Sequence, residues 1–205
     1  MAKKNTILFG GTFDPIHIGH TAVAMHALQV IGAEKIIFIP AKQSPLKKIS
    51  PKASDNARVE MISLAIADNN KFSVSDCELK KTQPSYTLET IKYFQETLGP
   101  DASLYWLIGA DCLDELPHWY QIDELIDRCN LCVMYRAGFE KPDFEKLTDT
   151  LDQTRIGKLK QNVIETPLIN ISSTLVRKKL TASEDVTDML CPAVAEYIKQ
   201  HNLYR

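Results

Sequence analysis

Short apolar runs alternate with amphipathic stretches along almost the whole 205-residue chain, and this alternation most limits the folds open to it. The run KIIFIP is apolar on both faces, which is typical of a strand in a buried parallel sheet. Alternation of this kind predicts an α/β fold, a doubly wound parallel sheet with C-terminal helices. Strands are expected at residues 5–9, Lys35–Pro40, 72–79, 103–111 (running into a loop), 130–136 and 162–167. Helices are expected at Ile18–Ile31, 55–67, 86–98, 121–128, 172–180 and 191–205.

The sequence contains no internal repeat and no evident linker, so we predict one domain over residues 1–205, with a helical C-terminal part at about 171–205. The charged stretch 140–161 is predicted to be a surface excursion with some helix.

Composition narrows the function classes. A net charge of −2, 44% hydrophobic and 24% charged residues are ordinary for a globular protein and do not indicate nucleic-acid or membrane-surface binding. No stretch reaches the roughly 18 apolar residues of a membrane span, and the apolar run near the start is too short for a signal peptide. We therefore expect a cytoplasmic protein, monomeric or homodimeric, that binds neither membrane nor nucleic acid.

The chain has five cysteines, of which Cys129 and Cys132 form a C-x-x-C pair. That pair allows three interpretations: redox chemistry, half of a zinc site, or small core residues. No second pair with ligand spacing lies nearby, so we predict core residues, without disulfides and without a protein-held metal.

Two unusual loops follow expected strands, at residues 10–20 and 109–111. In a doubly wound sheet, ligands bind beyond the carboxyl ends of the strands, where the strand order reverses. We therefore expect the functional site at that edge.

The first loop, GGTFDPIHIGH, matches neither standard phosphate-loop spelling. Gly10 and Gly11 are expected to let backbone approach a ligand and to tolerate positive φ. His17 and His20 lie three residues apart in the first turn of a helix, so both rings can face one anion near the helix N-terminus. The alternative is that both histidines only cap and pack.

A second motif, ISSTLVR, spans residues 171–177. Ser172, Ser173 and Thr174 are expected to offer hydroxyls and free N–H groups at a helix start. Arg177 lies one turn later and could reach the same phosphates. A capping cluster beside an exposed arginine would give the same pattern.

Together the two motifs resemble the T/H-x-G-H and I-S-x-T-x-x-R signatures of the nucleotidylyltransferase superfamily, whose fold is Rossmann-like. Four further stretches (39–48, 84–90, 108–120 and 197–205) resemble the bacterial nicotinate mononucleotide adenylyltransferases, so the similarity covers nearly the whole chain. The resemblance implies catalytic roles for His17, His20 and Arg177. It implies ATP contacts at Gly10, Gly11, Thr12, Phe13, Lys47, Gly109, Asp111, Arg136, Ser172, Ser173 and Thr174. It implies nicotinate mononucleotide contacts at Ser85, Tyr86, Thr87 and Trp119.

The acceptor residues also make chemical sense. Tyr86 and Thr87 stand where a helix begins, with N–H groups suited to a carboxylate, and the face of Trp119 would attract a pyridinium ring. Trp119 could instead be a core or interface aromatic. The chain departs from the family at Leu46, where the resemblance implies a histidine, and at Ala41, where it implies an asparagine.

The resemblance implies adenylyl transfer from ATP to nicotinate mononucleotide in NAD biosynthesis, with Mg²⁺ arriving on ATP. One alternative is another adenylyltransferase, such as a phosphopantetheine adenylyltransferase, although those chains lack the S-Y-T and L-P-x-W-Y segments. The other is a dinucleotide-sensing module that binds without reacting.

Overall fold

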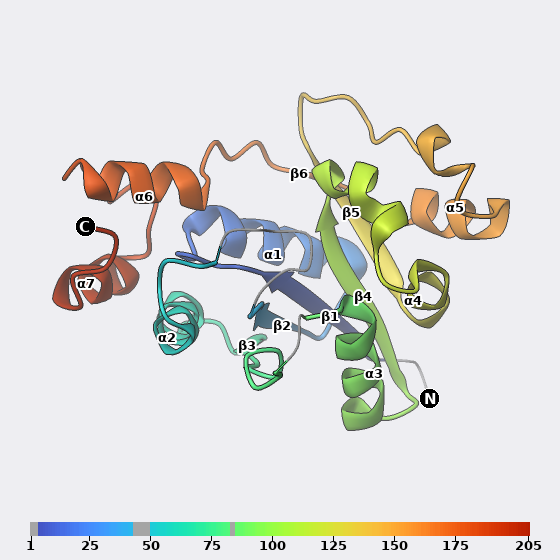
Figure 1. Ribbon diagram of the computed structural model, residues 1–205, viewed down its shortest axis with the longest axis horizontal. Coiled ribbons are helices and arrows are strands. Elements are labelled where there is room, and N and C mark those ends of the chain that lie inside the picture. Colours follow the sequence, from blue (N-terminus) through green and yellow to red (C-terminus); the bar gives the residue numbers. More distant parts are fainter. Residues whose placement is uncertain (1–3, 43–49, 83–84) are drawn as a thin grey trace.

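A computed structural model describes residues 4–42, 50–82 and 85–205. Its centre is a six-stranded sheet, parallel throughout, in the order β3-β2-β1-β4-β5-β6 (Figure 1). The strands are β1 (Lys4–Gly11), β2 (Lys35–Pro40), β3 (Phe72–Val74), β4 (Ala102–Gly109), β5 (Asn130–Arg136) and β6 (Val163–Thr166). The order reverses between β1 and β4, so the predicted doubly wound α/β sheet is confirmed.

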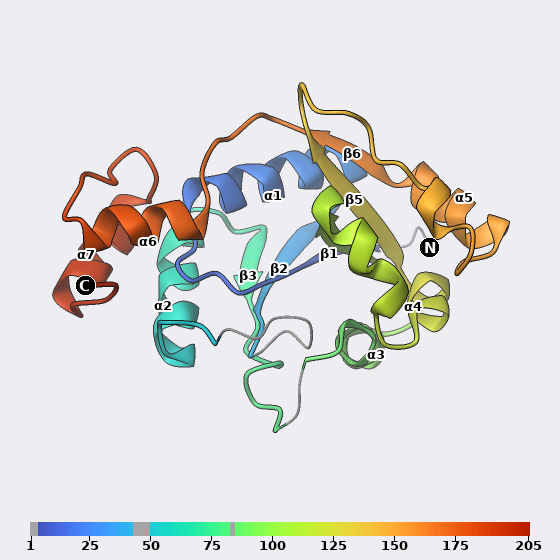
Figure 2. The same cartoon turned by 45° about the horizontal axis from the view of Figure 1, so that its top comes forward.

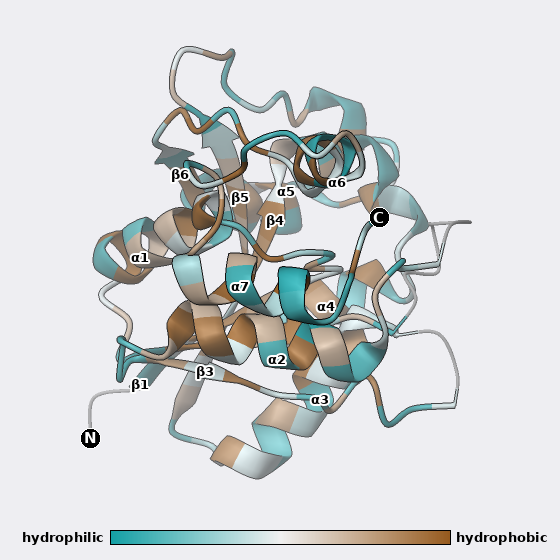
Figure 3. Cartoon of the chain, turned by 90° about the vertical axis from the view of Figure 1, so that its left-hand side faces the viewer, coloured by the Kyte–Doolittle hydropathy of each residue, from teal (hydrophilic) through white to brown (hydrophobic). Residues whose placement is uncertain are grey.

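Helices cover both faces of the sheet, as Figure 1 shows. One face carries α1 (Ile18–Ile31), α2 (Asp55–Ile66), α6 (Ser173–Thr181) and α7 (Pro192–Gln200). The other carries α3 (Thr87–Leu98), α4 (Ile122–Arg128) and α5 (Gln153–Gln161). The chain runs from β6 past α1 to α6, which brings the C-terminal helices to the side of α1 and α2 (Figure 2). There α7 packs against α2 (Figure 3).

Local sequence explains the helix ends. Helix α1 stops at Gly32, whose φ of 64° is left-handed. Helix α2 begins after Ser54, whose hydroxyl accepts the Ala57 N–H at 3.2 Å, as expected for an N-cap.

Three expectations about the bounds or type of elements were wrong in part. The strand expected at 72–79 is only β3, because the chain turns at Asp76, whose carbonyl accepts the Leu79 N–H. The loop expected after β4 is a 3-10 helix, η1 (Ala110–His118). The helix expected at 191–205 ends at Gln200, since Asn202 and Tyr204 adopt positive φ.

The helix predicted within the stretch 140–161 is confirmed, but the stretch is not a surface excursion. It holds a short 3-10 helix, η2 (Glu145–Leu147), and α5, and it contributes buried side chains to the core on the α3 side. These are Phe144, Leu147, Leu151, Ile156 and Leu159. The charged side chains of this stretch face outward. The apolar residues between them recur at helical spacing and point into the core.

Among the described residues, no helix is long and apolar enough to cross a membrane. A single domain over residues 1–205 stays a prediction.

Candidate active site

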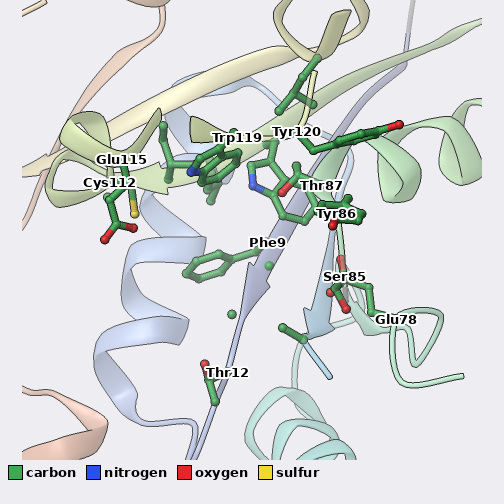
Figure 4. A pocket seen from close by; sticks show the side chains of 18 of the residues that line it. Phe9, Thr12, Glu78, Ser85, Tyr86, Thr87, Cys112, Glu115, Trp119 and Tyr120 are labelled. Atoms are coloured by element: carbon green, nitrogen blue, oxygen red, sulfur yellow. The ribbon is translucent and has the colours of Figure 1, made fainter. Parts of the chain in front are cut away.

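A cavity of about 520 Å³ opens at the carboxyl edge of β1, β2 and β4, beside the point where strand order reverses (Figure 4). Sequence-predicted residues on its walls are Gly10, Gly11, Thr12, Ser85, Tyr86, Thr87, Gly109 and Trp119. The two loops expected at this edge therefore do meet there. The volume falls within the range of small-molecule sites.

The glycine pair has a different role from the one expected. Gly10 and Gly11 are the last residues of β1 and do not adopt positive φ; that conformation falls on Phe13, at φ 48°. The glycines are needed because neighbouring rings cover them. A Cβ on Gly10 would lie 2.3 Å from Trp106, and a Cβ on Gly11 would lie 2.9 Å from Phe13. Phe13 itself is buried between Phe9, Phe38 and the His20 ring, so it shapes the site from behind.

The start of α3 forms one wall of the cavity. Tyr86 is its N-cap residue, and no side chain from the described residues caps this end. The first-turn N–H groups, including that of Thr87, therefore remain available to an anion. Figure 4 shows Ser85, Tyr86 and Thr87 on this wall and Trp119 on another. The buried Nε1 of Trp119 has no hydrogen-bond partner within the described chain.

Glu78 also lines the cavity, next to Ser85 in Figure 4, and the sequence did not single it out. Its side chain is 3% exposed and accepts the Thr90 hydroxyl at 2.7 Å, which ties the 76–80 turn to α3. Burial raises the pKa of the Glu78 carboxyl. The only signal in the sequence was an acidic residue inside an apolar pattern.

The two histidines lie together at the start of α1, as predicted. Their rings stack with centroids 3.7 Å apart. The His17 backbone N–H donates to Nδ1 of His20 at 3.2 Å, so a neutral His20 carries its proton on Nε2. Burial lowers the pKa of His17 to about 4, and burial together with the neighbouring His17 lowers the pKa of His20 well below its ordinary 6.5. Both rings are therefore neutral at neutral pH.

The two sequence motifs, far apart in the chain, are in direct contact. The Ser173 hydroxyl donates to the Pro15 carbonyl at 2.9 Å, and Nη1 of Arg177 donates to the Asp14 carbonyl at 2.6 Å. This places the start of α6 against the loop that leads into α1. The prediction that residues 171–177 and 10–20 form two sides of one site is consistent with this contact.

The hydroxyls of the second motif already have protein partners. Ser172 caps α6 by accepting the Leu175 N–H at 3.1 Å, Ser173 bonds to Pro15, and Thr174 accepts from Nη2 of Arg177 at 3.2 Å. In the described chain, the backbone N–H groups of Ser173 and Thr174 have no acceptor. What this motif has left for an anion is therefore backbone N–H and guanidinium, rather than hydroxyl.

Two buried charged residues that the sequence did not reveal hold the loop. Asp14 is 4% exposed and accepts the backbone N–H groups of Lys52 at 2.8 Å and Ala53 at 3.0 Å. Arg58 is fully buried, and its Nη1 donates to the carbonyls of Thr12 and Ala41, both at 2.8 Å. One guanidinium thus joins the segments that follow β1 and β2, which fixes the floor of the cavity.

Several predicted residues that the structure describes are not among those that line the cavity: Phe13, His17, His20, Asp111, Arg136, Ser172, Ser173, Thr174 and Arg177. Asp111 is exposed at the start of η1, and a Cβ on Gly109 would lie 2.2 Å from its Oδ1, so the carboxylate folds back over the glycine. Arg136 is exposed at the end of β5. Lys47 and Leu46 lie outside the described residues. The ATP contacts of Asp111, Arg136 and Lys47 stay predictions.

Cys129 and Cys132 are buried in the cores on opposite faces of the sheet, as the core interpretation predicted. Burial raises the pKa of Cys132 to about 12. Such thiols are unreactive at neutral pH.

Residues 8–179 match the model of the family described as cytidylyltransferase-like. The chain belongs to this family. It is 37% identical to a Clostridium tetani protein named "Probable nicotinate-nucleotide adenylyltransferase", over 98% of this chain and all of that one. It is 36% identical to a Rhodopirellula baltica protein of the same name, over 97% of this chain and 92% of that one. The resemblance predicted from the motifs is thus confirmed, and the chain is a nucleotidyltransferase.

The fold has solved counterparts. A Plasmodium falciparum nicotinic acid mononucleotide adenylyltransferase complexed with NaAD superposes with a TM-score of 0.70. The two are 21% identical, and the match covers 98% of this chain and 97% of that one. At this identity the likeness supports the α/β fold alone.

Proposed function

We propose that the protein transfers the adenylyl group of ATP to nicotinate mononucleotide, giving nicotinic acid adenine dinucleotide and pyrophosphate. An oxygen of the 5′-phosphate attacks the α-phosphorus in line, a new P–O bond forms, and the bond to the bridging oxygen of pyrophosphate breaks. The attacking phosphate is already ionised at neutral pH, so the reaction needs no general base. Catalysis then rests on aligning two anions and stabilising charge on the leaving group.

The observation that carries the acceptor assignment is the pairing of an uncapped helix start with an indole across one cavity. The N–H groups at Tyr86 and Thr87 suit the carboxylate of nicotinate. The face of Trp119 suits a pyridinium ring. Full-length relatives that carry the nicotinate-nucleotide name support the same acceptor.

The triphosphate would lie between the two motifs. Because the imidazoles are neutral, His17 and His20 would contact phosphate oxygens as N–H donors, and Arg177 would supply the positive charge. Mg²⁺ would add further charge neutralisation on the phosphate oxygens. Among the described residues, no group of three or more His, Cys, Asp or Glu side chains could hold a metal ion, and in this proposal Mg²⁺ arrives bound to ATP.

A substrate panel tests the proposal. Pyrophosphate release from ATP is measured with nicotinate mononucleotide, nicotinamide mononucleotide and phosphopantetheine as acceptors. We expect the fastest release with nicotinate mononucleotide. Preference for phosphopantetheine would indicate a different adenylyltransferase, and no release with any acceptor would indicate a sensing module.

A histidine variant tests the catalytic assignment. His20→Ala should lower turnover far more than it weakens binding of nicotinate mononucleotide, because the ring would act on ATP. His201→Ala is the matched control, since His201 is exposed and its ring stacks on Tyr197 and bonds to the Tyr197 carbonyl at 3.0 Å. Near-normal turnover in His20→Ala would refute the role of His20.

A cytoplasmic location and a monomeric or homodimeric state also belong to the proposal. Cell fractionation tests the first, and sedimentation of the purified protein tests the second.

A further inference from the structure

A closed ring of hydrogen bonds joins the first motif, the second motif and the segment after α7. Nη1 of Arg177 donates to the Asp14 carbonyl at 2.6 Å, and the Tyr204 hydroxyl donates to Oδ1 of Asp14, also at 2.6 Å. The Thr181 hydroxyl lies 3.1 Å from the Tyr204 carbonyl and 3.0 Å from the Arg177 carbonyl and shares its proton between them. Tyr204 therefore contacts the loop before α1 through its side chain and helix α6 through its backbone.

Tyr204 is held tightly in this place. It is 8% exposed and has φ 62°, a left-handed conformation that non-glycine residues rarely adopt. Burial raises the pKa of its phenol, so the hydroxyl stays a donor at any working pH. A buried phenol in an unfavourable backbone conformation indicates that the contact with Asp14 outweighs the local cost.

The Tyr204 hydroxyl also decides how Asp14 and Arg177 share their charges. Oδ1 of Asp14 accepts from Tyr204 and Ala53, and Oδ2 accepts from Lys52, so three donors satisfy the carboxylate. Nη1 of Arg177 lies 3.9 Å from Oδ2, which is an ion-pair distance but too long for a hydrogen bond. Without the phenol, the buried carboxylate would lose one donor, and the guanidinium 3.9 Å away is a group that can replace it.

We propose that Tyr204 is a positioning residue that keeps the Arg177 guanidinium off the Asp14 carboxylate and turned toward the ATP phosphates. The inference about Tyr204 rests on the proposed function, because that function assigns Arg177 to the binding of ATP. Tyr204 itself touches no substrate. It acts through Asp14 on the phosphate half of the site and leaves the acceptor half, at the start of α3, unchanged.

The test is Tyr204→Phe, which removes the hydroxyl and keeps the ring. We expect kcat/KM for ATP to fall roughly tenfold, the size of one charge-assisted hydrogen bond, while KM for nicotinate mononucleotide stays unchanged. If Tyr204 had a merely structural role, the substitution would lower the amount of folded enzyme, and the KM values for ATP and nicotinate mononucleotide would not respond differently. If KM rises equally for ATP and for nicotinate mononucleotide, or if kcat/KM for ATP does not fall, the proposal is overturned.

Two further variants make the result decisive. Thr181→Val opens the ring at another bond and should give a smaller loss in the same direction, also confined to ATP. It keeps the proposal testable if Tyr204→Phe does not fold. Tyr197 lies on α7, and its ring stacks on His201 rather than on Asp14. Tyr197→Phe removes its hydroxyl and should behave as wild type. An ATP-specific loss in Tyr197→Phe would overturn the assignment to Tyr204.

Calorimetric titration of ATP into the same proteins separates this inference from the proposed function. If wild type binds ATP but transfers nothing to any acceptor, the proposed function fails, and the Kd ratio between wild type and Tyr204→Phe still decides the role of Tyr204. If wild type is active and that ratio is one, only the inference fails.

Discussion

Replacing Gly10 by alanine tests whether the last residues of β1 are small because the Trp106 ring lies over them. The new Cβ would lie 2.3 Å from Cζ2 and 2.6 Å from Cη2 of Trp106. Ordinary contact begins near 3.4 Å, so the ring must move by about 1 Å. Trp106 is 5% exposed and lines the cavity, and overpacking of this kind costs about 1–3 kcal/mol.

The assay is urea unfolding followed by fluorescence, with the free energy of unfolding compared between variants. For a chain of this size, each kcal/mol also lowers Tm by about 2–4 °C. Gly157→Ala is the matched control, since nothing lies within 4 Å of its Cβ and it stands inside α5. That control should gain about 0.5–1 kcal/mol.

A double variant makes the reasoning refutable. Trp106→Phe removes the two ring atoms that the new Cβ would meet, so Gly10→Ala should cost less in that background. The coupling energy should reach about 1 kcal/mol or more. A Gly10→Ala protein as stable as wild type, or a coupling energy near zero, would refute the steric account.

Three other outcomes are expected. Arg58→Met should lower the free energy of unfolding by about 2–4 kcal/mol, because the carbonyls of Thr12 and Ala41 lose their buried donor; Arg58→Lys should recover only part of this in the same urea assay. His17 has a folded-state pKa of about 4 against an ordinary 6.5, so the unfolded chain binds more protons between these values. Stability should be complete above about pH 6.5 and fall by about 3 kcal/mol as the pH drops toward 4, and His17→Gln should flatten that slope in unfolding measured against pH. Trp119→Ala should raise KM for nicotinate mononucleotide roughly tenfold, and Trp119→Phe less, in the pyrophosphate assay; equal KM values would remove the indole from the acceptor site.

Local patterns predicted those features whose causes are local. The helix that starts at Thr87 and the stop at Gly32 follow from residues within one turn, and both stand where expected. The His17–His20 pair is also a short-range feature, because three residues in a helix bring side chains to one side.

Features whose partners lie far along the chain could not be predicted. No local pattern marks Asp14 as a buried acceptor, yet its carboxylate accepts the Tyr204 hydroxyl across 190 positions. Arg58 lies in a stretch that the sequence marks only as a helix, and only the packed structure brings the carbonyls of Thr12 and Ala41 to it. The positive φ expected at the glycines falls on Phe13, because packing of rings, and not local propensity, decides the backbone there.

The contact between the two motifs also has a kinetic meaning. Residues 14 and 15 meet residues 173, 177 and 204 across 158 to 190 positions, whereas β1 pairs with β2 across 29, from Thr6 to Lys35. Joining segments so far apart costs chain entropy before any contact compensates it, so such contacts form after shorter-range pairing. A refolding chain should therefore protect its β1–β2 amides from exchange before it regains ATP affinity, and for that interval it would have a sheet without a working phosphate site.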